Sequence, residues 1–499
     1  MPEYLPIIRP ARLSATMRPA AAANRILFTA AEMADFIKVG GLGDVAAALP
    51  RVLRRHADVR VLLPGLPAVR KAASNAASGL QIVRRMPGMA GLPPWSLGRF
   101  ATPDGLGIYV VLCDELYDRP GTPYGPSAGS DFPDNARRFA QLSRAVAELA
   151  AGEADPDWTP DVVHLNDWHT ALASGYLRWK GVATPSILTI HNLAYQGLFD
   201  RACLAELGIP AAAFAIDGVE FHGRLSFLKG GIFYASQVTT VSQTYAREIT
   251  TPAYGCGLDG LLAERWRQGR LTGIVNGIDD SWAHLVDGAQ ISDHVVQQWK
   301  RQNAAAVRAM FELPQSHGPL FSVISRLVQQ KGVDLSLAAA ERIVALGGQV
   351  VIMGHGEPAL ERQVAGLAQR YPHAVAAHIG FDEAAGRRLF AASDFLLMPS
   401  RFEPCGLSQM YAQRSGALPI ASRTGGLVDT IEDGVSGFLF RPLTRAGLLG
   451  AVMRALATFY SRSTYRHMRD HAMARDFDWR VPAHRYVDLY ARALAGQGA

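Results

Sequence analysis

The stretch that decides the fold of this 499-residue chain is a short segment near its carboxyl end, Ser400-Arg401-Phe402-Glu403-Pro404-Cys405-Gly406-Leu407-Ser408-Gln409-Met410-Tyr411. It follows the apolar run 395–399, which has the length and composition of a buried parallel strand. After Gly406, apolar residues recur at helical spacing. The segment is therefore predicted to be a strand, a tight turn that contains Pro404, and the first turn of a helix.

This turn is predicted to bind an anion beside a hydroxylated group. The N–H groups of Gly406, Leu407 and Ser408 would point out of the helix start, where the helix dipole favours negative charge. Glu403 is a poor partner for an anion, but its carboxylate is a good acceptor for hydroxyl groups. The combination suggests a sugar phosphate or a sugar nucleotide as ligand. The alternative is an ordinary strand–helix turn with Glu403 on the surface.

The composition indicates a globular protein with at least two domains. Hydrophobic residues make up 49% of the chain and charged residues 19%, so sizeable cores can form. The 50 Lys and Arg residues exceed the 44 Asp and Glu residues only mildly, and no basic run is interleaved with aromatics. An anionic small-molecule substrate explains this balance as well as nucleic acid does, and we expect no nucleic-acid partner.

Cysteine usage and hydropathy favour a cytoplasmic protein. The four cysteines stand far apart, without a CxxC pair, so neither a zinc site nor a disulfide framework is indicated. No apolar run approaches the roughly 18 residues that a membrane span needs. Residues 1–23 are rich in Ala, Pro and Arg, as in a transit peptide or a disordered extension. We favour a flexible extension, because no amphipathic pattern is visible.

The first half of the chain predicts a parallel, doubly wound α/β sheet. A strand over 26–29 leads into the glycine-rich loop 38–44 and a helix over 45–53, an arrangement that lets backbone N–H groups approach a phosphate or sugar. Strands alternate with helices from there on. Further strands are predicted over 59–63, 108–112, 161–165, 186–190, 238–241 and 271–275, and helices over 135–150 and from residue 170 to 179.

Two polar residues follow two of these strands directly. Asp167 and His191 each lie just past the carboxyl end of a predicted strand, the edge at which open α/β sheets bind ligands. A structural hydrogen-bonding role is the alternative for the histidine. His164, His169 and His191 lack a metal-ligand spacing such as HExxH, so no metal site is expected.

The pattern restarts after Asn276-Gly277-Ile278-Asp279. Strands are predicted over 321–324, 349–353, 375–379, 395–399 and 419–421, with a helix over 333–346. We expect one Rossmann-like domain over 24–276 and a second over 277–475, facing each other across a cleft. Residues 476–499 are expected to pack back across the hinge, with a helix over 476–493.

Six motifs, which follow one another along the chain in the family's order, resemble those of the bacterial glycogen synthases and plant starch synthases, over about residues 24–480. They are the Ser400–Tyr411 segment, Lys38-Val39-Gly40-Gly41-Leu42, Asp167-Trp168-His169, His191-Asn192-Leu193-Ala194-Tyr195-Gln196-Gly197, Asn276-Gly277-Ile278-Asp279, and Ser325-Arg326-Leu327 with Gln330-Lys331-Gly332. The resemblance implies the GT-B fold, two facing Rossmann-like domains. It also implies transfer of glucose from ADP-glucose to the 4-OH of an α-1,4-glucan, with retention at the anomeric carbon.

Site roles follow from the resemblance, position by position. Arg326 and Lys331 would hold the diphosphate, and Glu403 would accept from the glucose hydroxyls. His191 and Asp167 would lie near the glucose. The remaining donor-binding positions implied by the resemblance are Lys38, Gly40, Gly41, Asn276, Phe381, Cys405, Gly406, Leu407 and Ser408. The cleft and acceptor positions are Tyr117, Tyr124, Asp44 and Asn192.

Three positions carry variations on the family pattern. Phe381 occupies the place of an aromatic against the adenine that is often Tyr, and keeps the stacking face. Ser408 replaces a more familiar Thr and keeps a hydroxyl. Gly43 stands where Ala or Ser is also found. The resemblance implies no metal ion or other cofactor, because Arg and Lys would stabilise the leaving diphosphate. It leaves the oligomeric state open.

Three other classes of protein fit the sequence less well. Sucrose- or lipopolysaccharide-type GT-B enzymes usually carry a second Glu eight residues after the first, where this chain has Tyr411. A catalytically inactive glucan-binding protein would be expected to lose charged site residues, yet all of them are present. A phosphorylase would be longer, and no phosphopyridoxal site is recognisable.

Overall fold

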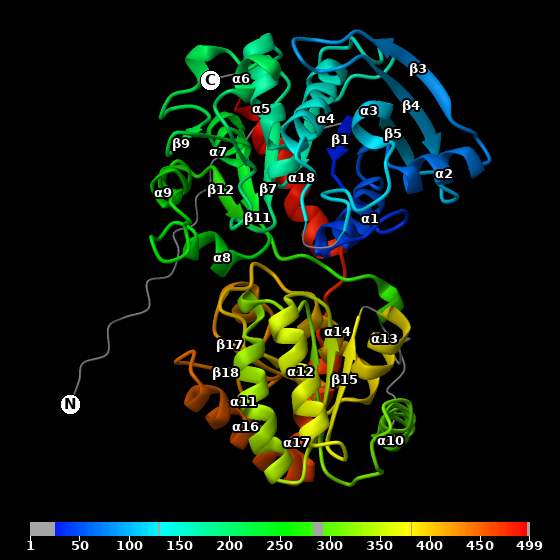
Figure 1. The fold of residues 1–499 in the computed structure, drawn as a ribbon, viewed down its shortest axis with the longest axis vertical. Helices are drawn as coiled ribbons and strands as arrows, with labels where there is room; N and C mark the ends of the chain where they lie inside the picture. The colour runs from blue at the N-terminus through cyan, green and yellow to red at the C-terminus, as the bar shows by residue number, and fades with distance from the viewer. Residues whose placement is uncertain (1–24, 128–129, 283–292, 381, 497–499) are drawn as a thin grey trace, which may run out of the picture.

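The chain folds into two bodies, placed one above the other in Figure 1. A computed structural model describes residues 25–127, 130–282, 293–380 and 382–496. Each body holds a mainly parallel sheet flanked by helices, which confirms the predicted pair of Rossmann-like domains. The predicted extension 1–23 and Phe381 lie outside the described residues. No helix in the described part of the chain is long and apolar enough to cross a membrane.

The first body is built on a nine-stranded sheet. Its strands, in spatial order, are β12 (Leu271–Gly273), β11 (Gln237–Thr240), β7 (Ser186–Ile190), β6 (Val162–Asn166), β1 (Arg25–Thr29), β2 (Asp58–Pro64), β5 (Gly107–Leu112), β4 (Trp95–Ala101) and β3 (Gln81–Met86). A separate small sheet holds β8 (Leu198–Phe199), β10 (Arg224–Ser226) and β9 (Glu220–Phe221).

One edge of the large sheet is antiparallel, which the sequence did not predict. β3 pairs with β4, and β4 with β5, in antiparallel register. Only a short irregular segment joins β3 to β4. It is too short for the long connection that two parallel neighbouring strands require. The charged, exposed side chains Arg84 and Arg85 on β3 suit an edge strand, because they discourage pairing with another chain.

Helices cover both faces of this sheet. They are α1 (Gly41–Leu53), α2 (Pro67–Asn75), α3 (Asp114–Tyr117), α4 (Asn135–Ala150), α5 (Trp168–Lys180), α6 (Cys203–Glu206), α7 (Phe227–Tyr234), α8 (Gln243–Glu248) and α9 (Asp259–Arg267), with a 3₁₀ turn over Ala211–Ala213. The predicted helix over 135–150 has these bounds in the structure.

The second body holds a six-stranded, wholly parallel sheet. Its strands, in spatial order, are β15 (Val375–Ile379), β14 (Gln349–Gly354), β13 (Leu320–Ile324), β16 (Phe395–Met398), β17 (Leu418–Ser422) and β18 (Phe438–Phe440). The helices are α10 (Asp293–Met310), α11 (Val333–Ala345), α12 (Pro358–Arg370), α13 (Glu383–Ala392), α14 (Ser408–Arg414), α15 (Gly425–Thr430), α16 (Arg445–Tyr460) and α17 (Arg462–Ala474), with 3₁₀ turns over Asp280–Trp282 and Gln329–Lys331.

Two segments of chain cross between the bodies side by side. Residues 274–278 lead out of the first body and residues 475–479 lead back, and the Ile278 N–H donates to Phe477 O at 2.8 Å. Gly277 lets them approach, because a Cβ there would lie 2.8 Å from the Trp479 backbone. We call these two segments the crossover.

The last helix, α18 (Arg480–Ala495), belongs to the core of the first body. His164 on β6 bonds to Tyr490 Oη at 2.8 Å and to Thr189 Oγ1 at 2.7 Å, and burial lowers the pKa of this histidine to about 3. The helix begins at Arg480 rather than at the predicted residue 476. The Asp476 and Asp478 carboxylates accept backbone N–H groups two residues on, which holds the preceding residues in turns.

Candidate active site

The Ser400–Tyr411 segment has the predicted strand–turn–helix form. It joins β16 to α14, and Gly406 adopts φ +73°, a conformation that favours glycine. The buried Gln409 side chain donates to the carbonyls of Cys405 and Gly406 at 3.0 and 2.9 Å. The Gln409 side chain therefore fixes the carbonyl groups of the turn from its buried side.

Glu403 and Lys331 form an ion pair at the centre of this region. Lys331 Nζ lies 2.6 Å from Glu403 Oε2, and the Ser400 hydroxyl donates to the same oxygen at 3.0 Å. Glu403 is only 4% exposed. This ion pair fixes the direction of the Lys331 side chain. Lys331 follows β13 and Glu403 follows β16, so the two residues come from the ends of different strands.

Arg326 lies on the loop that also supplies Lys331. Its side chain is exposed, and Nη1 donates to the Tyr195 hydroxyl of the first body at 3.3 Å. Gly332, at φ +65°, ends this loop where a Cβ would lie 2.0 Å from Pro399 O. This close approach ties the Arg326–Lys331 loop to the strand that precedes Glu403. Both cations therefore lie at one strand-end edge of the second sheet.

The glycine-rich loop of the first body comes close to the turn over residues 403–408 of the second, which we call the donor turn. A Cβ on Gly41 would lie 3.6 Å from Leu407 Cδ1, which places the two loops against each other. Lys38 Nζ pairs with Asp44 Oδ1 at 2.7 Å. Burial raises the pKa of Asp44, and Lys38 opposes that rise. The strand-end loops of the two bodies thus meet, as two facing domains require.

Glu32, which the sequence analysis missed, supports this loop from below. It is 2% exposed, and its carboxylate accepts the N–H of Val39 at 2.5 Å and further N–H groups from Gly40 and Gly43. Burial raises its pKa to about 7. Because Glu32 occupies these N–H groups, those of Gly41 and Leu42 at the start of α1 are left to offer an anion. A lone acidic residue after the first strand gives no sequence signal of such a role.

Asp167 caps helix α5 in a strained conformation. Its φ is +61° with ψ −177°, a region that non-glycine residues rarely occupy. The carboxyl accepts the backbone N–H of Trp168 at 3.2 Å, and N–H groups of His191 and Asn192 also reach it. Burial nevertheless raises its pKa to about 8, and Glu32 adds to the rise. The group is therefore largely uncharged near neutral pH.

His191 is a neutral hydrogen-bonding group with a fixed tautomer. The Asn166 amide donates to Thr29 O at 3.0 Å, which leaves Asn166 Oδ1 to accept from His191 Nε2 at 3.0 Å. Nδ1 then carries the lone pair. Burial lowers the pKa of the imidazole to about 3. His191 can thus accept from a hydroxyl through Nδ1 or its carbonyl, but it carries no charge.

The two tyrosines of the predicted cleft loop have different surroundings. Tyr124 stacks on His169 at 4.7 Å and bonds to Glu32, beside the glycine-rich loop. Tyr117 does not line a cleft, and that prediction is wrong. Its side chain is fully buried in the core of the first body, where its hydroxyl donates to Arg138 O at 2.5 Å.

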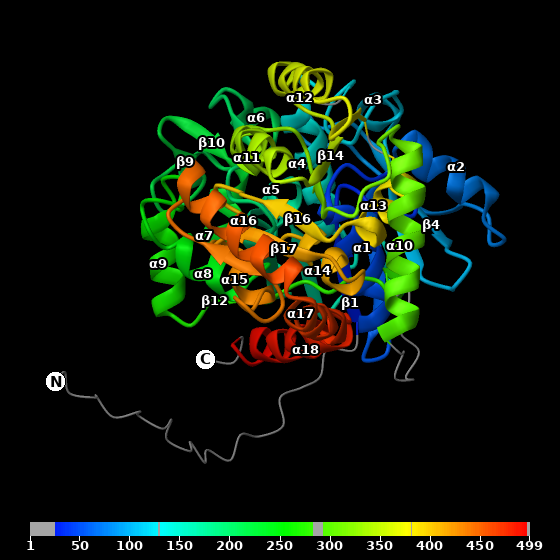
Figure 2. The ribbon, with the colours of Figure 1, turned by 90° about the horizontal axis from the view of Figure 1, so that it is seen from below.

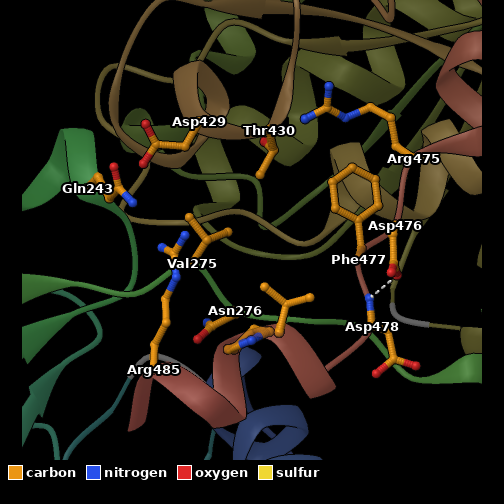
Figure 3. A pocket seen from close by; sticks show the side chains of 12 residues that line it. Gln243, Val275, Asn276, Asp429, Thr430, Arg475, Asp476, Phe477, Asp478 and Arg485 are labelled. Carbon is orange, nitrogen blue, oxygen red and sulfur yellow. Dashed lines mark hydrogen bonds between the residues drawn. The ribbon is translucent and has the colours of Figure 1, made fainter. Parts of the chain in front are cut away.

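Asn276 and Cys405 meet where the crossover passes the donor turn. The Asn276 backbone N–H bonds to the Cys405 thiol, whose pKa burial raises to about 12. The Asn276 side chain is 6% exposed and borders a cavity of about 320 Å³ at the crossover (Figure 3). Asn192 accepts the N–H of Ala194 at 3.1 Å, which shapes the turn after His191.

Acidic residues at Asp-x-Asp spacing occur twice, but in structural roles. Asp155 accepts the Tyr109 hydroxyl at 2.5 Å beneath the first sheet. Asp476 and Asp478 form the crossover turns described above. Within the described ranges, no group of three or more His, Cys, Asp or Glu side chains is arranged to hold a metal ion.

Comparison with known proteins agrees with this geometry. The family model for the starch synthase catalytic domain matches residues 25–264, and that for group 1 glycosyl transferases matches residues 318–458. The structure superposes on the catalytic domain of starch synthase IV from Arabidopsis thaliana, bound to ADP and acarbose, with a TM-score of 0.83 at 31% identity, covering 95% of this chain and 100% of that one. The fold and the site thus define a glycosyltransferase of the GT-B class.

Curated relatives define the family more closely. The glycogen synthase of Pseudomonas fluorescens is 52% identical over 97% of this chain and 92% of its own length. That of Xanthomonas euvesicatoria is 55% identical over 94% of this chain and 91% of its own length. The chain therefore belongs to the family of bacterial glycogen synthases and plant starch synthases, which are hexosyltransferases.

Proposed function

We propose that the chain extends an α-1,4-glucan by transferring glucose from ADP-glucose to the 4-OH at its non-reducing end, with retention and release of ADP. The observation that carries the proposal is the Lys331–Glu403 ion pair. It places a cation that can bind a diphosphate beside a carboxylate that can accept from sugar hydroxyls, at one edge of the second sheet. Arg326 and Lys331 bind the diphosphate, and Glu403 accepts from the glucose hydroxyls. ADP in the Arabidopsis relative supports the choice of nucleotide.

The cations would act most strongly in the transition state. As the bond from glucose to phosphate breaks, negative charge grows on the leaving diphosphate. Arg326 grips two oxygens as a fork, and Lys331 acts as a point charge. The cationic groups take the part that a metal ion would otherwise play, so we propose that the reaction needs no metal. Activity then survives excess EDTA, and complete loss that Mg²⁺ or Mn²⁺ restores would contradict this.

The glucose lies between the neutral groups of the first body and Glu403. His191 accepts a sugar hydroxyl, and Asp167 fixes the loop that carries it through the N–H groups of His191 and Asn192. Glu403 Oε2 is bonded to Lys331 and Ser400, its other oxygen is assigned to the glucose hydroxyls, and a raised pKa keeps Asp167 largely uncharged, so we assign neither residue as the nucleophile. We therefore propose front-face transfer without a glucosyl-enzyme. A glucosylated Glu403 or Asp167 found by mass spectrometry would contradict it.

Tyr411 bears on the alternative of another GT-B sugar transfer. It occupies the position of the second Glu of those enzymes and stacks on Trp282 at 3.8 Å, so no carboxylate lies there. The decisive test offers ADP-glucose and UDP-glucose together, with glycogen as acceptor, and measures both released nucleotides. We expect ADP to dominate, and the α-anomer in the product by NMR. Dominant UDP release would overturn the choice of donor.

A further inference from the structure

Two short helices join the bodies next to the crossover. Helix α8 is the first helix after β11 in the first body, and α15 follows β17 in the second. They lie side by side in the view from below (Figure 2). Each contributes one carboxylate to the other, Glu248 from α8 and Asp429 from α15.

The two carboxylates cap the partner helices reciprocally. Both oxygens of Glu248 lie 3.1 Å from the Gly425 N–H and 3.2 Å from the Thr424 hydroxyl, at the start of α15. Thr424 supplies no cap of its own. In return, Asp429 accepts the Thr244 N–H at 3.0 Å and the Thr244 hydroxyl at 2.6 Å, at the start of α8. Each body therefore completes a helix start in the other.

Helix α15 is fixed to the donor turn. A Cβ on Gly425 would lie 1.9 Å from Glu403 O, and one on Gly426 would lie 2.2 Å from Cys405 O. The Gly426 N–H donates to Glu403 O at 3.0 Å. No side chain fits between these backbones, so the start of α15 and Glu403 move as one unit.

Helix α8 is fixed to the sugar side of the first body. The Tyr245 hydroxyl accepts the N–H of Leu193, two residues after His191, at 3.2 Å. Thr240, at the end of the strand before α8, donates to Ile190 O at 2.8 Å. Helix α8 and the strand before it are thus bonded to the residues on both sides of His191.

We propose that Glu248 and Asp429 are positioning residues, whose reciprocal capping sets the distance between His191 in the first body and Glu403 in the second. They touch neither donor nor acceptor. Figure 3 shows Asp429 beside the crossover cavity, next to Gln243 of α8, so its contact with α8 lies beside the crossover. Breaking the contact leaves donor binding to the second body intact but lowers the fraction of molecules in which both bodies engage the glucose.

The test compares alanine and amide variants at both positions. Glu248→Ala and Asp429→Ala remove the acceptors, whereas Glu248→Gln and Asp429→Asn keep an amide oxygen for the backbone N–H groups. We expect kcat with ADP-glucose and glycogen to fall on the order of tenfold in the alanine variants. The dissociation constant for ADP, measured by calorimetry, should stay within about twofold, and the amide variants should keep at least about half of wild-type kcat.

A matched control is Glu264→Ala on α9, which should leave kcat unchanged, because Glu264 pairs with its neighbours Arg267 and Gln268 on the surface of the first body. Wild-type kcat in the alanine variants, or a loss of ADP affinity that parallels the loss of kcat, would overturn the proposal. So would amide variants as impaired as the alanine ones. The inference rests on ADP-glucose as donor; absence of wild-type turnover with it would contradict the proposed function, whereas the ratio of variant to wild type tests the positioning alone.

Discussion

The two sides of the site differ in charge. The second body presents the exposed Arg326 and the Lys331–Glu403 ion pair, in which Glu403 is nearly buried. The first body presents His191 and Asp167, whose pKa values burial moves so that both are largely uncharged at neutral pH. The difference matches the two parts of the proposed donor, because its diphosphate and its glucose need different binding groups. A diphosphate is bound by fixed positive charge. A sugar is bound by neutral hydrogen-bond donors and acceptors, which add no charge beside the departing diphosphate.

The largest expected effect comes from removing charge on the second body. We expect Lys331→Ala to lower kcat, as well as kcat/KM, by about 10²-fold, the usual cost of losing one electrostatic group that acts in the transition state. Arg326→Lys should also be poor, because the fork is lost. Steady-state kinetics with varied ADP-glucose at saturating glycogen checks this. A raised KM with unchanged kcat would reduce Lys331 to an anchor for the donor.

The neutral side is tested by the pH dependence of activity. His191→Ala should lower kcat by about tenfold or more, as for loss of a single hydrogen-bonding group at the reacting sugar. Because burial lowers the pKa of His191 to about 3, its imidazole stays neutral from about pH 5 upwards. We therefore expect the wild-type pH–rate profile to show no ionisation of this residue near neutrality. A pKa near neutrality that disappears in His191→Ala would contradict the claim that this side of the site is uncharged.

Much of this arrangement can be predicted from the sequence, because short apolar runs show where the buried strands end. The runs 186–190 and 395–398 are apolar and short, so the polar residues that follow them had to lie at a sheet edge. Glu32 could not be found in this way, since a buried carboxylate under a loop depends on tertiary contacts rather than on spacing. Tyr117 was misplaced for the related reason that a loop's composition does not show which aromatic turns inward. The antiparallel edge was missed because alternation on β3 is weak.

The uncharged state of Asp167 has a consequence for stability. Its pKa is raised from 3.8 to about 8, so the folded state binds the proton more tightly than the unfolded chain does. That contribution is complete at low pH and is lost as pH rises towards about 8. We expect Asp167→Asn to reduce the fall in Tm between about pH 5 and pH 8 by at least about 2 °C. Asp157→Asn, at an exposed position, is the control. Identical Tm curves for wild type and Asp167→Asn would contradict a raised pKa.

The smallest effect on activity is expected at Tyr117. Tyr117→Phe removes the hydroxyl that donates to Arg138 O, which should cost about 1 kcal/mol of stability. The reaction itself should change less than twofold, because the side chain lies in the core. Tyr124→Phe is the matched comparison, since that hydroxyl bonds to Glu32 beneath the glycine loop. Denaturant unfolding and kinetics of both variants check this, and a lower kcat in Tyr117→Phe alone would reverse the assignment.

The central claim, that charge on the second body binds the nucleotide while the first body binds sugar, is tested most directly by calorimetric titration of ADP. We expect Arg326→Ala to weaken ADP binding by about tenfold or more, with a smaller effect at high salt. His191→Ala should leave the dissociation constant within about twofold of wild type. Equal weakening by His191→Ala and Arg326→Ala would contradict this division between the two bodies.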